Sequence, residues 1–311
     1  LNDSRADTLR AYIRVLSRAL PRAFLLENVQ GLAFSKKDEG LKYLLTQIKR
    51  INTTTGSNYR PSVRVLNAAA YGVPQMRERV FVVAFRDGQE FKFPDETHFD
   101  PTNVNAQLDL TRPRMTPYLT AWDAIGDVVP ASDEDLTLRG KWAGLLPSIP
   151  EGQNYLWHTD RGGGRPLFGW RRRYWSFLLK LAKARPSWTL QAQPGPAIGP
   201  FHWENRRLSS REMCRIQTFP DDVQVYGSRT SVQKQIGNAV PSLLAEVLAR
   251  QIRQQLFNER LETSHPQLVP RTNRPLPAPE PITRVPAAYV QLEGIHEAHP
   301  GTGRGFAASL R

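Results

Sequence analysis

The stretch "AFLLENVQG", residues 23–31, decides how the first part of the chain folds. Its apolar run has the length of a buried strand, yet it ends in Glu27 and Asn28 before a glycine. A carboxylate at the end of a strand is most often a capping group or one half of a salt bridge. Whether Glu27 has a chemical role instead depends on what the rest of the chain brings near it.

Helical and strand-like patterns alternate on both sides of this stretch. Residues 5–20 place apolar side chains at helical spacing, Pro21 ends that pattern, and residues 40–51 repeat it. The runs "SVRVLNAA" (62–69) and "RVFVVAF" (79–85) predict two further strands. Such alternation predicts a parallel or mostly parallel α/β sheet covered by helices, in which ligands bind at the carboxyl ends of strands.

The texture of the sequence changes along the chain and predicts four regions. A loop-rich domain, with much proline, glycine and tryptophan, interrupts the α/β domain, and a proline-rich tail with no apolar period is expected to be disordered. The expected regions are an α/β domain at 1–87, a loop-rich insertion at 88–205, the return of the α/β domain at 206–258, and the tail at 259–311.

Composition narrows the class of protein. The 311 residues carry 42 Lys and Arg against 29 Asp and Glu, a net charge of +13, which favours a polyanionic partner, although ribosomal and membrane-surface proteins share such a charge. No apolar run is long enough to cross a membrane and no signal peptide is recognisable, so we expect a soluble, cytoplasmic protein. A single cysteine and six scattered histidines predict no disulfide and no metal.

A second polar cluster follows in "YGVPQMRERVFVVAFR", residues 71–86. Gly72 and Pro74 predict a turn, and Arg77 and Arg79 alternate at the entry of the next strand. Two arginines beside a strand are also common on a solvated edge. What favours a shared site with Glu27 is the order of the motifs.

That order resembles the carbon-5 cytosine DNA methyltransferases of bacterial restriction-modification systems, from the fifth to the tenth family motif and over residues 2–256. The matching blocks, in sequence, are "DSRADTL" (3–9), "ENV" (27–29), "NAAAYGVPQMRERV" (67–80), "RRLSSREMCRIQTFPDD" (206–222) and "QIGNAVPSLLAEVL" (235–248). The resemblance implies an incomplete Rossmann-like class I methyltransferase sheet with an inserted loop-rich target-recognition domain. It also implies methyl transfer from S-adenosyl-L-methionine to carbon 5 of a flipped cytosine in a specific site of double-stranded DNA.

The chemistry of cytosine gives these residues their implied roles. Carbon 5 is a poor nucleophile, so the family adds a thiolate at carbon 6, and an acid or donor at ring nitrogen 3 must neutralise the resulting charge. By resemblance Glu27 is that group, Arg79 contacts Glu27 and the base oxygen, and Arg77 points toward the DNA backbone. Burial would raise the pKa of Glu27 and a neighbouring arginine would lower it, which leaves the net shift open.

Other implied contacts come from the same resemblance. Asn238, Ala239 and Val240 match the tenth motif and Leu9 the fifth, both beside the cofactor, although "GNAV" before a helix could be only a cap. Residues 161–191 contain eight Lys or Arg and no acidic residue, interleaved with aromatic side chains, which suits DNA or a solvated basic face over an aromatic mini-core. The expected DNA contacts are Gln75, Arg165, Arg171, Arg172, Arg173 and Thr189.

The sequence also departs from the family. The family's glycine-rich cofactor loop and its Pro-Cys nucleophile are not in these residues. The single cysteine, Cys214, lies in the ninth motif and is expected to be a packed side chain. In the same motif Ser209 and Glu212 predict a capping box. Three readings stay open: a fragment of a longer enzyme, one half of a split enzyme whose first half is a separate chain, or a non-catalytic DNA-binding or regulatory relative. We expect the chain alone to be inactive and poorly soluble, with an unpaired apolar sheet edge.

Overall fold

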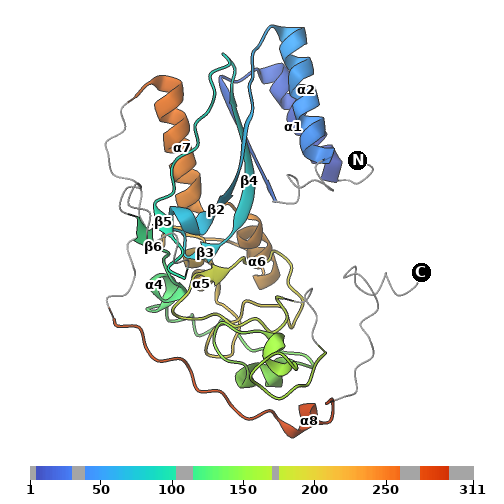
Figure 1. Ribbon diagram of the computed structural model, residues 1–311, viewed down its shortest axis with the longest axis vertical. Coiled ribbons are helices and arrows are strands. Elements are labelled where there is room, and N and C mark those ends of the chain that lie inside the picture. Colours follow the sequence, from blue (N-terminus) through green and yellow to red (C-terminus); the bar gives the residue numbers. More distant parts are fainter. Residues whose placement is uncertain (1–4, 30–38, 103–114, 170–174, 260–273, 294–311) are drawn as a thin grey trace, which may run out of the picture. The chain divides into compact units, whose positions relative to one another are not determined.

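The computed structural model describes residues 5–29, 39–102, 115–169, 175–259 and 274–293 (Figure 1). Its contacts divide the chain into two compact units. The first unit comprises Leu1–Tyr118 and Val240–Leu268, and the second comprises Leu119–Ala239 and Val269–Arg311.

The first unit is built on a three-stranded sheet with helices on both faces (Figure 1). Its described elements are α1 (Arg5–Ala19), β1 (Ala23–Val29), α2 (Glu39–Thr55), β2 (Ser62–Asn67), the 3-10 helix η2 (Ala68–Tyr71), β3 (Gln75–Met76), β4 (Glu78–Phe85), β5 (His98–Phe99), β6 (Thr116–Pro117) and α7 (Ser242–Phe257). The predicted helices and strands of this region are therefore confirmed, with bounds shifted by a few residues.

Strand β4 is the centre of this sheet and is almost completely buried. Val82 and Ala84 face α1 and α2, where they pack with Phe24, whereas Phe81 faces α7 and packs with Leu244. Alternate side chains of one strand thus serve two apolar layers, as the two-residue period of a strand requires. This explains why "RVFVVAF" is apolar throughout and does not alternate.

The expectation of a parallel or mostly parallel sheet is wrong for this sheet as the structure describes it. The order is β1-β4-β2, and β4 pairs antiparallel with both neighbours. The cause lies in the connection from β2 to β4, which holds only η2 and β3 and is too short for a crossover helix. Strands β1 and β2, joined through α2, do run in the same direction, but β4 separates them.

The second unit is rich in loops and holds two apolar clusters. Its described elements are α4 (Ala121–Ile125), the 3-10 helices η3 (Ala143–Ser148) and η4 (Tyr155–His158), β7 (Ser187–Trp188), α5 (Ser210–Ile216), α6 (Arg229–Asn238) and α8 (Ala287–Val290). Helices α4, α5 and α6 pack around one cluster. The other is aromatic, with Trp142, Tyr155, Phe168 and Phe177 around buried leucines. Two of the tryptophans considered for an aromatic mini-core from the sequence, Trp175 and Trp188, are instead 45% and 36% exposed.

Residues 274–293 belong to the segment expected to be disordered, but they pack on the second unit. Tyr289 stacks on Trp142 with ring centroids 5.9 Å apart, and its hydroxyl donates to the carbonyl of Lys141 at 2.9 Å. Proline content and missing periodicity predicted disorder because they argue against helices and strands. An extended segment can still order itself by packing side chains into another part of the protein. We call residues 274–293 the strap.

The compact units also cut the chain at other places than the expected boundaries at 88 and 206. Residues 206–239, expected to return to the α/β domain, have their contacts in the second unit, and only α7 rejoins the first. Residues 206–239 pack through α5 and α6 against α4, which explains their place there. The predicted capping box of Ser209 and Glu212 at the start of α5 is confirmed.

Candidate active site

The carboxyl ends of β1 and β2 and the amino end of β4 meet at one end of the sheet. In the register of these strands Glu27 lies opposite Phe81, and Val29 lies opposite Arg79. Glu27 and Arg79 are therefore diagonal neighbours on one face, a separation that long side chains can bridge. The Nε atom of Arg79 lies 3.0 Å from Oε1 of Glu27. The expected contact between these two residues is present.

Burial and charge act on Glu27 in opposite directions. Both partners of the ion pair are largely buried, with 22% of the Glu27 side chain and 14% of the Arg79 side chain exposed. Loss of hydration is the largest effect and raises the pKa of Glu27, whereas Arg79 and Arg77 lower it. The pKa is raised on balance, which settles the direction that the sequence left open. A carboxyl group with a raised pKa keeps its proton to higher pH, as a general acid must.

Arg77 and Gln75 are both buried, with 1% and 0% of the residue exposed. Their expected contacts with DNA stay predictions. Burial lowers the pKa of Arg77 to about 10, still well above neutral pH. Arg77 is therefore a buried positive charge close enough to Glu27 to affect its pKa.

The turn that places the arginines depends on a residue that sequence reasoning missed. The Oδ1 atom of Asn67 accepts hydrogen bonds from the backbone N–H groups of Ala69 and Arg77, each at 3.2 Å. Gly72 continues the turn with φ of 85°, a left-handed conformation that favours glycine. Asn67 thus ties the end of β2 to the start of β4. An asparagine directly after an apolar strand was the available signal.

Two of the expected cofactor contacts lie at the same end of the sheet as Glu27. The hydroxyl of Tyr12 donates to the carbonyl of Leu25 at 3.1 Å, and Leu9 lies one helical turn further toward the carboxyl end of β1. On the opposite face, Val240 packs with the cluster around Phe81. The structure therefore places Leu9 and Val240 on opposite faces at the strand ends where α/β proteins bind ligands.

The other two cofactor candidates belong to the second unit. Asn238 is the last residue of α6, and Ala239 is its C-cap, donating its N–H to the carbonyls of Gln235 and Ile236. The cap reading of "GNAV" thus describes what these backbone groups do. Next to them Gly237 is tightly packed, because a Cβ atom at this position would lie 2.5 Å from the backbone of Ala192.

The cations of the basic segment 161–191 differ in exposure, since some lie at the surface of the second unit and others are buried in it. Arg165 is half-exposed and forms an ion pair of 2.6 Å with Glu293 of the strap, and Thr189 is half-buried. Lys180 and Lys183 are buried, so two of the eight cations of residues 161–191 serve the interior. Burial lowers the pKa of Lys180 to about 8. Arg171, Arg172 and Arg173 lie outside the described residues.

Cys214 is a packed side chain, as expected. It is 4% exposed in the cluster of α4, α5 and α6, and burial raises the pKa of its thiol, which disfavours a thiolate. Among the described helices none is both long and apolar enough to cross a membrane. The same part of the chain holds no group of three His, Cys, Asp or Glu side chains arranged for a metal ion.

Known proteins resemble this chain over most of its length. The Type II methyltransferase M.SacI of Streptomyces achromogenes is 46% identical over 264 residues, covering 82% of this chain and 65% of the relative. M.NgoFVII of Neisseria gonorrhoeae is 32% identical over 257 residues, covering 81% of this chain and 64% of that protein. The chain therefore spans a little less than two thirds of the length of these relatives.

Solved structures support the fold. A prophage-encoded E. coli protein described as a DNA modification methyltransferase superposes with a TM-score of 0.54 at 19% identity, covering 83% of this chain and 76% of the other. A DNMT2 mutant of Spodoptera frugiperda gives 0.50 at 14% identity, covering 81% and 73%. The family model described as C-5 cytosine-specific DNA methylase matches residues 1–254. By that match, the chain belongs to the C-5 cytosine-specific DNA methylase family.

Proposed function

We propose that this chain is the part of a DNA (cytosine-5-)-methyltransferase that holds and protonates a cytosine flipped out of a specific duplex site. The observation that carries the proposal is the ion pair of Glu27 and Arg79 at the carboxyl ends of β1 and β2, with the pKa of Glu27 raised by burial. Membership of the family supports methyl transfer as the reaction.

In the proposed reaction a thiolate forms a bond to carbon 6 of the cytosine, and negative charge passes into the ring. Glu27 donates its proton to ring nitrogen 3 and neutralises that charge, so carbon 5 becomes the nucleophilic end of an enamine. Arg79 holds the Glu27 carboxyl group in place and contacts the base oxygen. After methylation a base such as water takes the carbon 5 proton, the thiolate leaves carbon 6, and the proton on ring nitrogen 3 returns to Glu27, which restores the aromatic base.

S-adenosyl-L-methionine would supply an electrophilic methyl group to carbon 5. Leu9 and Val240 fit apolar contacts to such a ligand, because both are partly buried at the strand ends beside Glu27. The residues described here offer no comparable partner for its charged amino-acid part.

The thiolate is proposed to come from outside these 311 residues, either from the same longer polypeptide or from a partner chain. The span of about two thirds of the relatives supports this proposal. So does the outer strand β1, where Leu25 and Val29 are 36% and 56% exposed. A glycine-rich loop and a Pro-Cys motif encoded upstream in the same reading frame would identify the first case. The same two motifs in a separate neighbouring reading frame would identify the second.

The second unit is proposed to read the DNA site, in place of the insertion at 88–205. The proposed DNA contacts are the partly exposed Arg165 and Thr189 and an exposed pair of tryptophans, Trp175 and Trp188, whose rings lie 5.4 Å apart. Cation-bearing loops beside aromatic side chains suit both phosphate and base contacts.

The test is Glu27→Gln in the enzyme completed with its nucleophile-bearing part. Methyl transfer from labelled S-adenosyl-L-methionine should fall by about 100-fold or more, the usual range for a lost general acid, while DNA binding persists. Glu78→Gln is the matched control, since Glu78 is an exposed glutamate one residue before Arg79. Turnover of Glu27→Gln equal to that of the control would remove Glu27 from the mechanism.

A further inference from the structure

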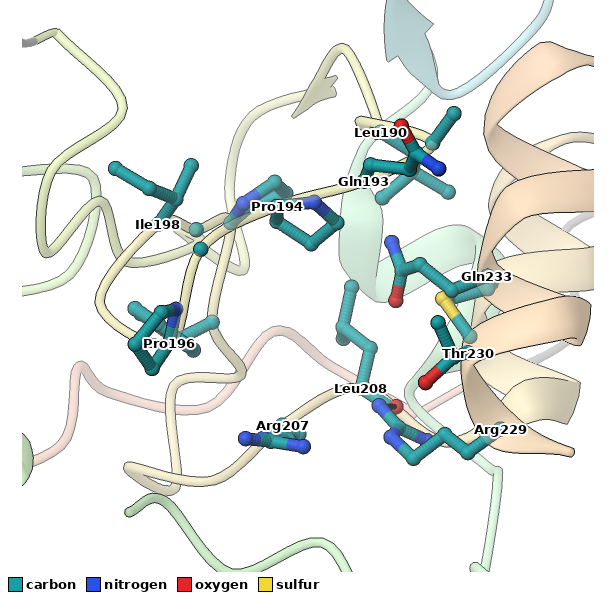
Figure 2. A pocket seen from close by; sticks show the side chains of 16 residues that line it. Leu190, Gln193, Pro194, Pro196, Ile198, Arg207, Leu208, Arg229, Thr230 and Gln233 are labelled. Carbon is teal, nitrogen blue, oxygen red and sulfur yellow. Dashed lines mark hydrogen bonds between the residues drawn. The ribbon is translucent and has the colours of Figure 1, made fainter. Parts of the chain in front are cut away.

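A cavity of about 540 Å³ lies within the second unit, outside the site of Glu27 (Figure 2). Its walls come from the loop of residues 190–201, from Arg207 and Leu208 before α5, and from the first turns of α6. A cavity of this size is in the range that binds small ligands, which is about 300–1,000 Å³. Neither the family motifs nor the proposed chemistry gives it a role.

One wall of the cavity is polar and held rigidly. Arg229 donates to a carboxylate oxygen of Glu134 at 2.7 Å and to the carbonyl of Leu208 at 2.6 Å. Glu134 also accepts from the N–H and the hydroxyl of Ser210, both at 2.9 Å, so it links the starts of α5 and α6. Arg229 is therefore a fixed part of the wall whose charge Glu134 compensates.

Arg207 contributes a second guanidinium group to the cavity (Figure 2). Burial lowers the pKa of Arg229, Glu134 raises it, and Arg207 lowers it, which shows that the two arginines are close enough to repel. Among the described residues no carboxylate forms an ion pair with Arg207, although Asp135, which pairs with Arg139 at 2.6 Å, is close enough for Arg207 to lower its pKa. The guanidinium of Arg207 is therefore a cation of the cavity that no carboxylate contacts directly.

The remaining walls are apolar with a few amide and hydroxyl groups. Leu190, Leu208 and Met213 are buried side chains of the lining, and Ile198 adds a half-buried one. Gln193, Gln233 and Thr230 supply the neutral polar groups. A guanidinium that no carboxylate contacts, beside an apolar wall, favours a ligand that has an anionic group attached to a flat, less polar body.

The place of the cavity in the chain identifies that ligand class. Its first residue, Leu190, directly follows Thr189 and lies one residue before the end of the segment 161–191, which has eight cations and no acidic side chain. Such a segment attracts a polyanion. Resting on the proposed function, we propose that the cavity takes one nucleotide of the bound DNA strand, with its phosphate on Arg207 and its sugar and base against the apolar wall.

The first test is the salt dependence of duplex DNA binding by the 311-residue chain, measured by fluorescence anisotropy. Arg207→Gln should weaken binding and reduce the slope of log K against log salt by about one, the effect of one lost phosphate contact. Arg207→Lys should retain the slope. The matched control is Arg284→Gln, an exposed arginine of the same unit outside the cavity lining, which should leave the slope unchanged.

The second test asks whether the cavity itself is occupied. Ile198→Trp fills it without changing charge, so affinity should fall at least fivefold with the slope retained. In duplexes with a single uncharged methylphosphonate linkage, one position of that linkage should weaken DNA binding by the parent chain and leave DNA binding by Arg207→Gln unchanged. Unchanged binding by both variants, each with the parent's melting temperature, overturns the proposal while DNA binding stands. No DNA binding by the parent chain, either alone or completed with its nucleophile-bearing part, overturns the proposed function with it.

Discussion

Two opposing effects set the pKa of Glu27, namely the burial of its carboxyl group and the two arginines close to it. Burial favours the neutral carboxyl group, while Arg79 at 3.0 Å and the buried Arg77 favour the carboxylate. Because burial prevails, the group can carry a proton and remain oriented by Arg79. Orientation and a raised pKa, which usually oppose each other beside an arginine, are thus combined at one strand end.

Removing Arg79 should shift the pH dependence of the completed enzyme. Arg79→Gln deletes the charge and the hydrogen bond that lower the pKa of Glu27, so this pKa should rise further. Activity that requires protonated Glu27 declines as pH rises through the pKa, so the alkaline limb of kcat/KM should move to higher pH, even though the rate falls. Arg64→Gln, an exposed arginine on β2, should leave the limb in place.

An alkaline limb that stays in place or moves to lower pH in Arg79→Gln would show that another group limits the reaction. The pH profile is the decisive measurement, because a purely structural role of Arg79 would lower the rate without moving the limb.

At the scale of elements, the start of α5 shows how a local pattern becomes a fixed structure. Ser209 accepts from the N–H of Glu212 at 3.1 Å, and Glu212 accepts from the N–H of Ser209 at 2.7 Å. Both are completely buried, and Arg206 adds two hydrogen bonds to Glu212, at 2.9 and 2.7 Å. The capping box is therefore also half of a buried ion pair.

Substitutions at this cap should differ in cost for that reason. Ser209→Ala removes one cap and should lower the free energy of unfolding by about 1 kcal/mol. Glu212→Ala leaves Arg206 without its main partner and should cost about 3 kcal/mol or more. Glu246→Ala, in an exposed pair with Arg250 on α7, should cost about 0.5 kcal/mol or less. Denaturant unfolding measures all three, and equal costs would contradict this account.

Local patterns predicted the elements better than the pairing of strands. Helical spacing at residues 5–20, the apolar run at 23–29 and the cap at Ser209 depend on neighbours in sequence, and all three are confirmed. The antiparallel position of β4 depends on the length of one connection. The burial of Arg77 and Lys180 depends on which distant segments cover them, which no local pattern contains.

At the scale of the whole molecule, the strap extends beyond the part that matches the family, which ends at residue 254. It is held on the second unit by a buried lysine. Lys183, with 3% of its side chain exposed, forms ion pairs with Glu151 and with Glu280 of the strap, the latter at 2.8 Å. Burial alone would lower the pKa of Lys183, but its hydrogen bonds to the two glutamates raise it. Glu280 of the strap is thus one of the two carboxylates that neutralise the buried charge of Lys183.

Shortening the chain to end at residue 273 should therefore destabilise the second unit. It removes one carboxylate from Lys183 and the ring of Tyr289 from Trp142. A loss of about 3 kcal/mol is expected, which lowers the melting temperature by roughly 6–12 °C. Glu280→Ala should reproduce part of this loss. Glu293→Ala should cost less than about 1 kcal/mol, because its pair with Arg165 is 38–49% exposed. If calorimetry gives the shortened and the full chain the same melting temperature, the strap does not stabilise the second unit.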